Sequence, residues 1–498
     1  MPARVFRLPP RAAEENRQGR MRRRNFLAAS AAQFGAVSIG AQAAPRPNIL
    51  FITADDLGLN LGCYGERRFA TPHLDRLASS GVRFTTAYVA QASCSPSRSA
   101  MFTGLYPHTN GQYGLANTGF RLHEQYTNRT IPVLAQKAGY RTGIIGKLHV
   151  EPESSFPWTF RKAGNTTRQV RTVAADAAGF IRASGDEPFF LMANFSDPHA
   201  FRNEKAVGGW DFPPQIDGVP EKPLPPGKET LFPWQQIDEE QQRIRTAGYF
   251  NAIQRLDEGI GQLMQVLEDA GKASNTVVIF VGDHGPPFAR GKTTVYESGL
   301  RVPFFLRWPG VTKAGQVSDR MVSTVDILPT ILDAIGATPP QGLHGASLRK
   351  AVTGGVWREF LAAEFHFHGA RPFFPRRAIR DGRYKLIHNL LAGRAKPSST
   401  IDGDQAYQYS RAAKYEGTPA RRAFDTFADP PEFELYDLTR DPIEFENLAA
   451  YKKHTQALER MKRALLQWRT DTSDPLLDPS VLEQWLRDGA PVTRENKR

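Results

Sequence analysis

Residues 48–56, NILFITADD, join an apolar run of strand length to a pair of aspartates. A short, continuous apolar run of this kind is typical of a strand that is buried on both faces of a sheet. The same character recurs in four later runs, RTGIIG at 141–146, PFFLMANF at 188–195, TVVIFVG at 276–282 and VPFFLRW at 302–308. Helical patterns at 71–81 and 248–271 lie between these runs, and the second ends at a glycine that can cap it. The alternation predicts an α/β fold in which helices cover both faces of a parallel sheet.

The chain changes character near residue 355. Before that point, residues 213–233 are too rich in proline for a helix or a central strand, and they predict a long surface loop. After it come two strand-like pieces, at 377–390 and 433–442, and then an amphipathic helix whose apolar face is made by Leu458, Met461, Leu465 and Trp468. We therefore predict a larger domain over 44–355, and a C-terminal α+β domain over 356–498 with a small antiparallel sheet and a helix.

The composition is that of an ordinary globular protein. The chain has 498 residues, of which 40% are hydrophobic and 23% charged, so it is long enough for two or three domains with their own cores. Its two cysteines can form at most one bridge, which excludes a disulfide scaffold. The basic residues form no dense run with interleaved aromatic residues, which argues against nucleic-acid binding.

The N-terminus has the order of a bacterial twin-arginine signal. Arginines at 22–24 precede Asn25, a weakly apolar run follows, and a small-x-small cleavage site stands at 41–43. Residues 1–43 hold eight Arg and two Glu, so the remainder carries about +7 of the total charge of +13. We predict that 1–43 are a signal segment, that the export machinery of the twin-arginine route is a partner, and that the mature protein is periplasmic.

Polar residues of catalytic type follow four of the five apolar runs. They are Asp55 and Asp56, Lys147 and His149, Asp197 and His199, and Asp283 and His284. In open α/β sheets ligands bind outside the carboxyl ends of the strands, so these four tails are expected to meet in one cleft.

Each of these features has an ordinary structural alternative when it is taken alone. The aspartate pair at 55–56 could cap a helix, residues 283–285 could form a turn, and His199 could be a core histidine. Lys147 and Lys292 would by default be solvated. Taken together, three carboxylates and one imidazole at the ends of two strands are a set of ligands suited to Ca²⁺ or Mg²⁺.

Cys94 lies in polar surroundings that do not suit a core cysteine. It follows an apparent strand, FTTAYVAQ at 84–91, and precedes SRSAMFTGL, which has the pattern of the first turns of a helix. A helix N-terminus favours anions, and Arg98 one turn later adds donors for a tetrahedral oxyanion. We interpret this segment as a nucleophile next to an anion-binding site.

At this point the residues resemble a known family. CSPSR at 94–98 has the C-x-P-x-R form of the type I sulfatase signature and is followed by the matching TGLYPHTNG. The resemblance continues through nearly all of the chain after the signal, in RPNILFITADD, LGCYG, TPHLDRLASSGVRFTTAY, TVVIFVGDHG and ELYDLTRDPIEFENLA. It implies an alkaline-phosphatase-like fold, with a large mixed but mostly parallel sheet between helices and a smaller C-terminal domain.

Within that family the chain is most similar to the heparan N-sulfatases, or sulfamidases. The segments that carry this likeness are NGQYGL, RTGIIGKLHV, PFFL with DPH, RLDEGIGQLMQVLEDAG and YKLIHNL. Two positions depart from the sulfamidase pattern, because His284 stands where asparagine is found and Lys292 where arginine is found. Histidine at this place also occurs in other sulfatases and in phosphonate monoester hydrolases.

The resemblance implies a role for each candidate residue. A formylglycine-generating enzyme would convert Cys94 to formylglycine, whose hydrate attacks sulfur, and a Ca²⁺ would be held by Asp55, Asp56, Cys94, Asp283 and His284. Mn²⁺ is admitted by the imidazole and Mg²⁺ by the carboxylates. Lys147, Lys292 and Arg98 would neutralise sulfate, His199 would protonate the leaving group, and His149 would help to expel sulfate. His366 and His368 are expected to contact the substrate.

The expected function is hydrolysis of the N-sulfate of glucosamine in heparin- or heparan-type saccharides. The alternatives are an O-sulfatase, an arylsulfatase or a phosphonate monoester hydrolase with the same nucleophile. A protein of another class, a non-catalytic binder of sulfated glycans, would keep Cys94 unmodified. The residues leave the oligomeric state open, with a homodimer as one alternative.

Overall fold

The computed structural model describes residues 46–162, 168–369 and 372–488. The predicted signal segment therefore lies outside the described residues. Pro45–Arg498 form one compact unit, so the domain boundary predicted near 355 stays a prediction. No helix within the described ranges combines the length and the apolar character needed to cross a bilayer.

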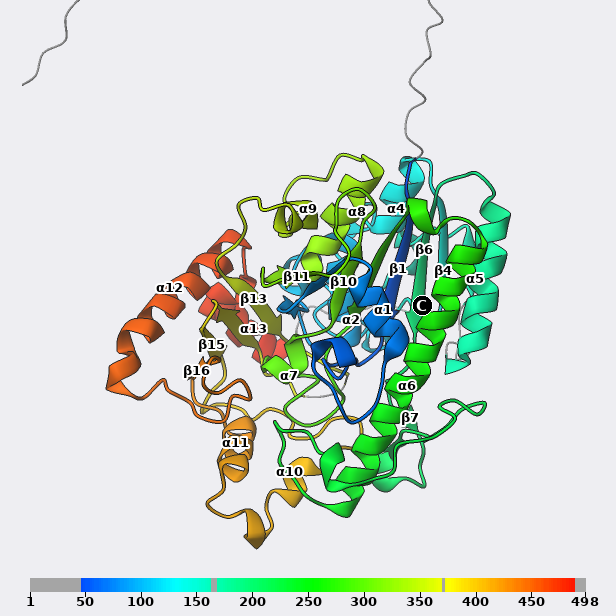
Figure 1. Ribbon diagram of the computed structural model, residues 1–498. Helices are drawn as coiled ribbons and strands as arrows, with labels where there is room; N and C mark the ends of the chain where they lie inside the picture. The colour runs from blue at the N-terminus through cyan, green and yellow to red at the C-terminus, as the bar shows by residue number, and fades with distance from the viewer. Residues whose placement is uncertain (1–45, 163–167, 370–371, 489–498) are drawn as a thin grey trace, which may run out of the picture. The chain divides into compact units, whose positions relative to one another are not determined.

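An eight-stranded sheet forms the centre of the molecule (Figure 1). In spatial order its strands are β11 (Gln316–Ser318), β2 (Val82–Phe84), β10 (Phe304–Arg307), β9 (Thr276–Gly282), β1 (Asn48–Ala54), β6 (Phe189–Phe195), β4 (Arg141–Ile145) and β5 (Phe160–Lys162). The four predicted runs that end at catalytic-type residues are β1, β4, β6 and β9, and they are neighbours in the order β9-β1-β6-β4.

The sheet is mixed but mostly parallel. β1 is parallel to both β9 and β6, and β4 is parallel to both β6 and β5. β10 pairs antiparallel with β9 and with β2, so the prediction of a parallel strand at 302–308 is wrong in direction. The reason is topological, because the chain turns back through α7 (Glu297–Leu300) to reach β10, and an apolar run carries no signal of strand direction.

The side chains of the central strands alternate between two cores. On β1, Ile49 and Phe51 belong to one hydrophobic cluster, whereas Leu50 and Ile52 belong to another. This period of two places apolar residues on both faces, which is why the run reads as continuously apolar.

Each face of the sheet has its own helices. One face packs α1 (Pro72–Ser79), α5 (Val170–Ser184) and α6 (Glu240–Asp269), and Figure 1 shows α6 running beside α5. The other packs α2 (Cys94–Thr103), α4 (Ile131–Lys137) and α8 (Ile327–Ile335). The helix predicted at 248–271 begins eight residues earlier, at Glu240, and ends before Gly271, whose φ is +63°.

A second, four-stranded antiparallel sheet lies beyond residue 355. Its order is β13 (Leu361–Phe365), β14 (Arg376–Arg380), β15 (Tyr384–Asn389) and β16 (Phe433–Asp437). The predicted amphipathic helix is α12 (Thr455–Asp471), which packs on β14 and β15. The predicted class is thus confirmed: an α/β core with a smaller α+β part.

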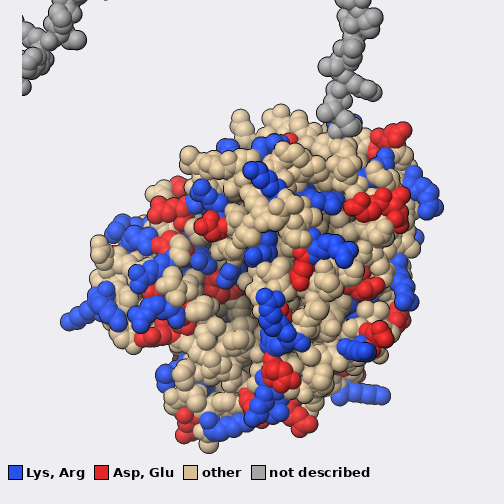
Figure 2. All heavy atoms as spheres, in the orientation of Figure 1, with Lys and Arg blue, Asp and Glu red and all other residues tan. Residues whose placement is uncertain are grey.

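The remaining elements are short. They are α3 (Pro107–Asn110), α9 (Leu348–Val352), α10 (Ala406–Tyr409), α11 (Pro419–Ala428), α13 (Pro479–Asp488) and the two-stranded pairs β3 (Ala87–Tyr88) with β12 (Val322–Ser323) and β7 (Phe201–Arg202) with β8 (Trp210–Asp211). The strand predicted at 84–91 is therefore divided: Phe84 ends β2 of the central sheet, and Ala87–Tyr88 form β3 in a separate small sheet. Figure 2 shows acidic and basic side chains interspersed over the face that it draws.

Candidate active site

Four strand ends meet at one edge of the central sheet. The amide of Asp55 donates to Phe195 O at the end of β6 (3.1 Å), and the amide of Asp283 donates to Ala54 O at the end of β1 (2.9 Å). These backbone bonds continue the parallel ladder for one residue beyond the strands, so the first polar residue of each tail has a fixed place. The structure thus brings the tails of β1 and β9 together, and those of β4 and β6 join them through the contacts below.

Cys94 begins helix α2 and points into this cluster. It is buried, with Sγ 3.2 Å from His284 Nε2 and 3.7 Å from Asp55 Oδ1. Burial opposes ionisation of the thiol, but the ammonium groups of Lys147 and Lys292 outweigh it and lower the pKa of Cys94 to about 6. The position therefore stabilises negative charge.

Arg98 lies one turn further along α2 and is fully buried. Its Nε and Nη2 atoms both lie 3.0 Å from Asp283 Oδ2, and its Nη1 donates to Asn194 Oδ1 (3.0 Å) and to Lys147 O (3.1 Å). The guanidinium thus joins the tails of β9, β6 and β4, which makes it a structural centre of the site as well as a positive charge.

The carboxylates of β1 face two lysines. Lys147 Nζ lies 2.8 Å from Asp55 Oδ2, and Lys292 Nζ lies 3.0 Å from Asp56 Oδ1. Burial opposes ionisation of Asp55, yet Lys147, His199 and Arg98 hold its pKa well below the usual range. Burial raises the pKa of Asp56 to about 6, against the pull of His199 and Lys292.

The geometry fits a divalent cation. Asp55, Asp56, Cys94 and His284 each present one ligand atom, and these atoms lie within 4.8 Å of one another. Asp56 Oδ1 is buried and makes no hydrogen bond within the described ranges, and its charged neighbours are Lys292 Nζ at 3.0 Å and His284 Nε2 at 3.2 Å. Burial raises the pKa of Asp283 to about 7, and its neighbours raise that of His284 to about 10 against burial. A cluster of buried carboxylates with this much negative charge is typical of a site for a divalent cation.

Two histidines border the cluster. His199 Nε2 lies 3.9 Å from Asp56 Oδ2, and its Nδ1 contacts Ala200 O. Nδ1 of His149 is buried and makes no hydrogen bond within the described part of the chain. Burial lowers the pKa of both rings, and the charge of Lys147 adds to the effect at His149. An imidazole can donate, accept or relay a proton.

Comparison with known proteins decides the family. Residues 47–337 match the family model described as Sulfatase, and residues 282–395 match the model described as N-sulphoglucosamine sulphohydrolase, C-terminal. The chain is 33% identical over 480 residues to the N-sulphoglucosamine sulphohydrolase of Homo sapiens, covering 89% of this chain and 94% of that protein. The chain belongs to the sulfatase family.

Solved structures share this sulfatase's fold. A structure described as a 2-O GAG sulfatase has a TM-score of 0.66 at 23% identity, and covers 86% of this sulfatase and 93% of that chain. The phosphonate monoester hydrolase of Agrobacterium radiobacter has a TM-score of 0.62 at 20% identity, with 86% and 96% covered. The predicted alkaline-phosphatase-like architecture and the resemblance to sulfamidases are confirmed, and this sulfatase is a hydrolase of sulfate groups.

The two histidines offered as substrate contacts have different outcomes in the sulfatase. His368 Nδ1 lies 2.8 Å from the hydroxyl of Ser93, the residue before Cys94, so it is beside the cluster. His366 is fully buried, its Nε2 is 3.5 Å from Glu364, and its ring packs edge-on to Tyr113. His366 thus lies in a buried charged cluster just after β13, and its role as a substrate contact stays a prediction.

Two residues that contact the site of the sulfatase were not predicted from the sequence. Asn194 lies within β6, accepts from Thr53 Oγ1 (2.6 Å) and Arg98, and fixes the guanidinium. A polar residue inside an apolar strand was the available signal. Asp402 approaches from the C-terminal part and lies 2.9 Å from Lys292 Nζ. Its loop, IDGDQ, has the composition of an ordinary turn, so no signal marked it.

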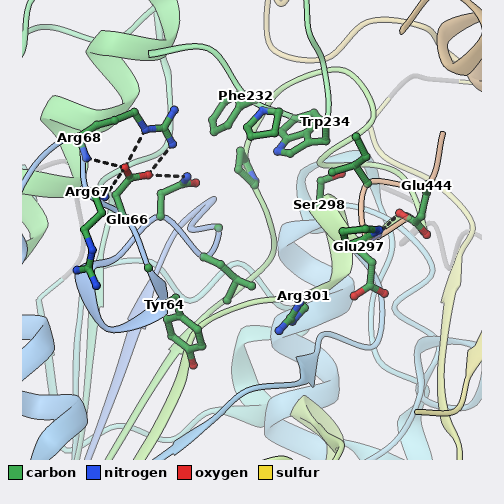
Figure 3. Close-up of a pocket in the computed structure, with 18 residues that line it drawn as sticks. Tyr64, Glu66, Arg67, Arg68, Phe232, Trp234, Glu297, Ser298, Arg301 and Glu444 are labelled. Carbon is green, nitrogen blue, oxygen red and sulfur yellow. Dashed lines mark hydrogen bonds and ion pairs between the residues drawn. The ribbon is translucent and has the colours of Figure 1, made fainter. Parts of the chain in front are cut away.

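A cavity of about 490 Å³ lies behind the loops that carry the metal candidates, and Figure 3 shows its lining. Gly58 and Pro286 border it, but none of the predicted site residues does. Its three carboxylates are already paired within the protein, Glu66 with Arg68, Glu297 with Arg380 and Glu444 with Lys385. It is thus a separate feature of the sulfatase and not the reactive centre.

Proposed function

We propose that this sulfatase removes the N-linked sulfate of glucosamine in heparan-type saccharides. The similarity to the human N-sulphoglucosamine sulphohydrolase extends over 94% of that protein, and residues 282–395 match the model described as N-sulphoglucosamine sulphohydrolase, C-terminal. Both support a sulfamate substrate over an arbitrary sulfate ester.

The observation that carries the reaction is the position of Cys94. It lies at the N-terminus of α2, between carboxylates suited to a cation and two lysine ammonium groups. Formylglycine made from this cysteine would, once hydrated, supply a hydroxyl group that attacks sulfur, and a divalent cation held by Asp55, Asp56, Asp283 and His284 would withdraw charge from the sulfate.

The chain's own cations then bind the sulfate group. Lys147 and Lys292 both lower the pKa of the Cys94 thiol, which supports a place for their ammonium groups beside any anion bound at this position. Arg98 links Lys147, which follows β4, to Asn194 of β6. Preorganised charges in a buried site stabilise a transition state because they need no reorganisation when charge develops.

The two histidines handle protons. His199, next to Asp56 and in ring contact with Trp210 (centroids 6.1 Å apart), is assigned to protonating the leaving amine, a step that requires its imidazolium form. His149, whose φ is +55°, is assigned to removing a proton from the oxygen at position 94 when sulfate departs. Strained backbone at such a position is common in active sites.

Ca²⁺ is our choice of ion, with Mn²⁺ and Mg²⁺ as alternatives. Three carboxylates favour a hard cation bound through oxygen, whereas the His284 imidazole suits a transition metal. Export through the twin-arginine route and maturation by a formylglycine-generating enzyme complete the proposal, and both rest on the sequence.

A second candidate rests on two residues. His284 and Lys292 depart from the sulfamidase pattern, and histidine at the first place also occurs in O-sulfatases and phosphonate monoester hydrolases. An O-sulfatase or a phosphonate monoester hydrolase with the same nucleophile is therefore the alternative reaction.

Both candidates are separated by one substrate comparison. Protein with matured Cys94 is given N-sulfoglucosamine, 6-O-sulfated N-acetylglucosamine and a phosphonate monoester, and the released anion is measured, with Cys94→Ala as the control for contaminating activity. We expect the highest kcat/KM on N-sulfoglucosamine. Turnover of the 6-O-sulfate alone, or a preference for the phosphonate, would replace our substrate assignment with the second candidate.

A further inference from the structure

A loop from the C-terminal part of the chain reaches into the candidate active site. Asp402, between β15 and α10, is buried, and its Oδ2 lies 2.9 Å from Lys292 Nζ. Asp56, His199 and Asp402 each present one ligand atom, and these three atoms lie within 4.8 Å of one another. Asp402 therefore faces two of the groups that act on sulfate.

The loop is held in place by the larger part of the molecule. Arg245 Nη2 donates to Asp402 O at 2.5 Å. The carboxylate of Asp404 accepts from the amide of Ala289 at 2.8 Å and from Gln235 at 3.2 Å. These contacts come from α6, from the segment just before it and from the segment that leads to Lys292, so the loop and the lysine are fixed to the same structure.

The backbone of the loop is unusual where Asp402 is presented. Asp402 has a φ of +45°, a conformation that residues other than glycine seldom adopt. Gly403 follows at φ +82°, and a Cβ there would lie 2.8 Å from Gly208 O. Strain at a buried carboxylate persists only where the surroundings enforce it, and here it directs the side chain at Lys292.

Lys292 has two carboxylate partners, Asp56 of the predicted cation site and Asp402. Its side chain is 1% exposed, and its Nζ lies 3.0 Å from Asp56 Oδ1 and 3.2 Å from Asp56 Oδ2. With Asp56 as the sole partner, the ammonium would be drawn onto a carboxylate of the cation site. Asp402 Oδ2, at 2.9 Å, is a second carboxylate partner, so the place of the ammonium is set by both carboxylates and not by Asp56 alone.

We propose that Asp402 is a positioning residue, which sets the place of the Lys292 ammonium and thereby completes the sulfate site from the C-terminal part of the chain. The proposal requires only sulfatase activity, so it does not depend on whether N-sulfate or O-sulfate is the natural substrate. A misplacement of about 1 Å of a charge that acts in the transition state costs on the order of 100-fold in rate.

A double-mutant cycle tests the proposal. Asp402→Asn, Lys292→Gln and the double variant are prepared with matured Cys94, and kcat and KM are measured on an aryl sulfate and on N-sulfoglucosamine. We expect Asp402→Asn to lower kcat about 10- to 100-fold with KM changed less than about threefold. In the Lys292→Gln background the same change should have little further effect, because the residue acts through the lysine.

Three controls make the outcome decisive. Asp402→Glu keeps the charge and should recover part of kcat, and thermal unfolding shows whether each variant is folded. Asp211→Asn alters a nearby carboxylate that contacts Asn203 (3.3 Å) and not Lys292, and it should stay within about twofold of the wild type. Wild-type kcat in a folded Asp402→Asn variant, or an equal loss with and without Lys292, would overturn the proposal whichever substrate is turned over.

Discussion

At the scale of single residues, the site is built from polar groups that are removed from water. All ten residues of α2 are buried, including Ser95, Arg98 and Ser99. Burial of a polar group is stable when the group is paired. Ser95 Oγ accepts from the amide of Ala116, Ser99 Oγ donates to Pro96 O, and the Arg98 guanidinium pairs with groups of three different strands or their tails. The polar neighbours of Cys94 thus serve the site and not a solvated surface.

The crowded carboxylates lead to a prediction on metal removal. Dialysis against a chelator should abolish turnover and lower the unfolding temperature, because Asp55, Asp56 and Asp283 then lose their shared counter-ion. Saturation at about 100 times the dissociation constant contributes about 2.7 kcal/mol to stability. Calorimetry with and without added Ca²⁺ or Mn²⁺ measures this. The Asp56→Ala variant should show no shift of the unfolding temperature on metal addition. The Asp176→Asn variant, with its substitution in α5, should show the full shift. An unfolding temperature that stays unchanged after verified metal loss would contradict the proposed metal site.

The assignment of His199 predicts a dependence on the leaving group. His199→Gln should lower kcat on N-sulfoglucosamine by 10²- to 10⁴-fold, because the amine must be protonated as it departs. An aryl sulfate whose phenolate is a stable leaving group should be affected far less. Steady-state kinetics on both substrates provide the comparison. Equal losses on the two would show that His199 has a different role, such as binding sulfate.

At the scale of elements, strand tails and one helix deliver the reactive groups, and buried ion pairs join the smaller sheet to its helix. Arg377 of β14 makes a bidentate pair with Asp474 (2.7 Å for both bonds), and Arg469 of α12 adds a third contact to the same carboxylate at 2.6 Å. Removing one partner of a buried pair leaves the other uncompensated. Asp474 therefore holds α12 against β14.

This pairing predicts a pH dependence of stability. Burial opposes ionisation of Asp474, but Arg377 outweighs it and holds its pKa well below the usual range. A depressed pKa means that the contribution is present above the unfolded value of about 3.9 and is lost as the pH falls below it. Asp474→Asn should cost about 3–5 kcal/mol of the free energy of unfolding at pH 7, and the gap should shrink below about pH 4.

Denaturant titrations of both proteins between pH 3 and pH 7 measure this gap. Asp186→Asn, at an exposed carboxylate 3.7 Å from Lys272, serves as the matched control and should change stability little at any pH. A gap that stays constant down to pH 3 would show that Asp474 contributes by packing and not by charge.

At the scale of the whole molecule, the two sheets share one core. The same hydrophobic cluster contains Phe304 and Leu306 of the central sheet and Ala363, Ile387 and Tyr436 of the smaller sheet. Unfolding of either sheet would therefore expose apolar side chains of the other sheet to water. The loop that carries Asp402 makes the same connection at the active site.

The shared core predicts a single unfolding transition. Calorimetry of the metal-bound protein should give one peak, and the tryptophan fluorescence and circular dichroism transitions should coincide. Leu306→Ala in β10 should lower its midpoint without splitting it, because a buried Leu→Ala change costs 2–5 kcal/mol. Two separate transitions would show that the parts before and after residue 355 unfold independently.

Several of the residues that sequence reasoning places at the site follow parallel strands. Asp55, Lys147, His199 and Asp283 were predictable because parallel strands end at a common edge, whatever lies between them in the chain. Asp402 was not, since it arrives through a loop whose course depends on packing far from its own sequence. The direction of β10 and the burial of His366 were not predictable for the same reason, because local sequence patterns carry no information about tertiary contacts.

The central claim is that the reactive group of this sulfatase derives from Cys94. The most direct test is sulfate release by protein from its native host, in a preparation where the mass of the Cys94 peptide has been determined, beside the Cys94→Ala variant. We predict an aldehyde in place of the thiol, release of sulfate from N-sulfoglucosamine, and near-complete loss of release in the variant. Full turnover with an intact thiol, or with alanine at position 94, would contradict the mechanism.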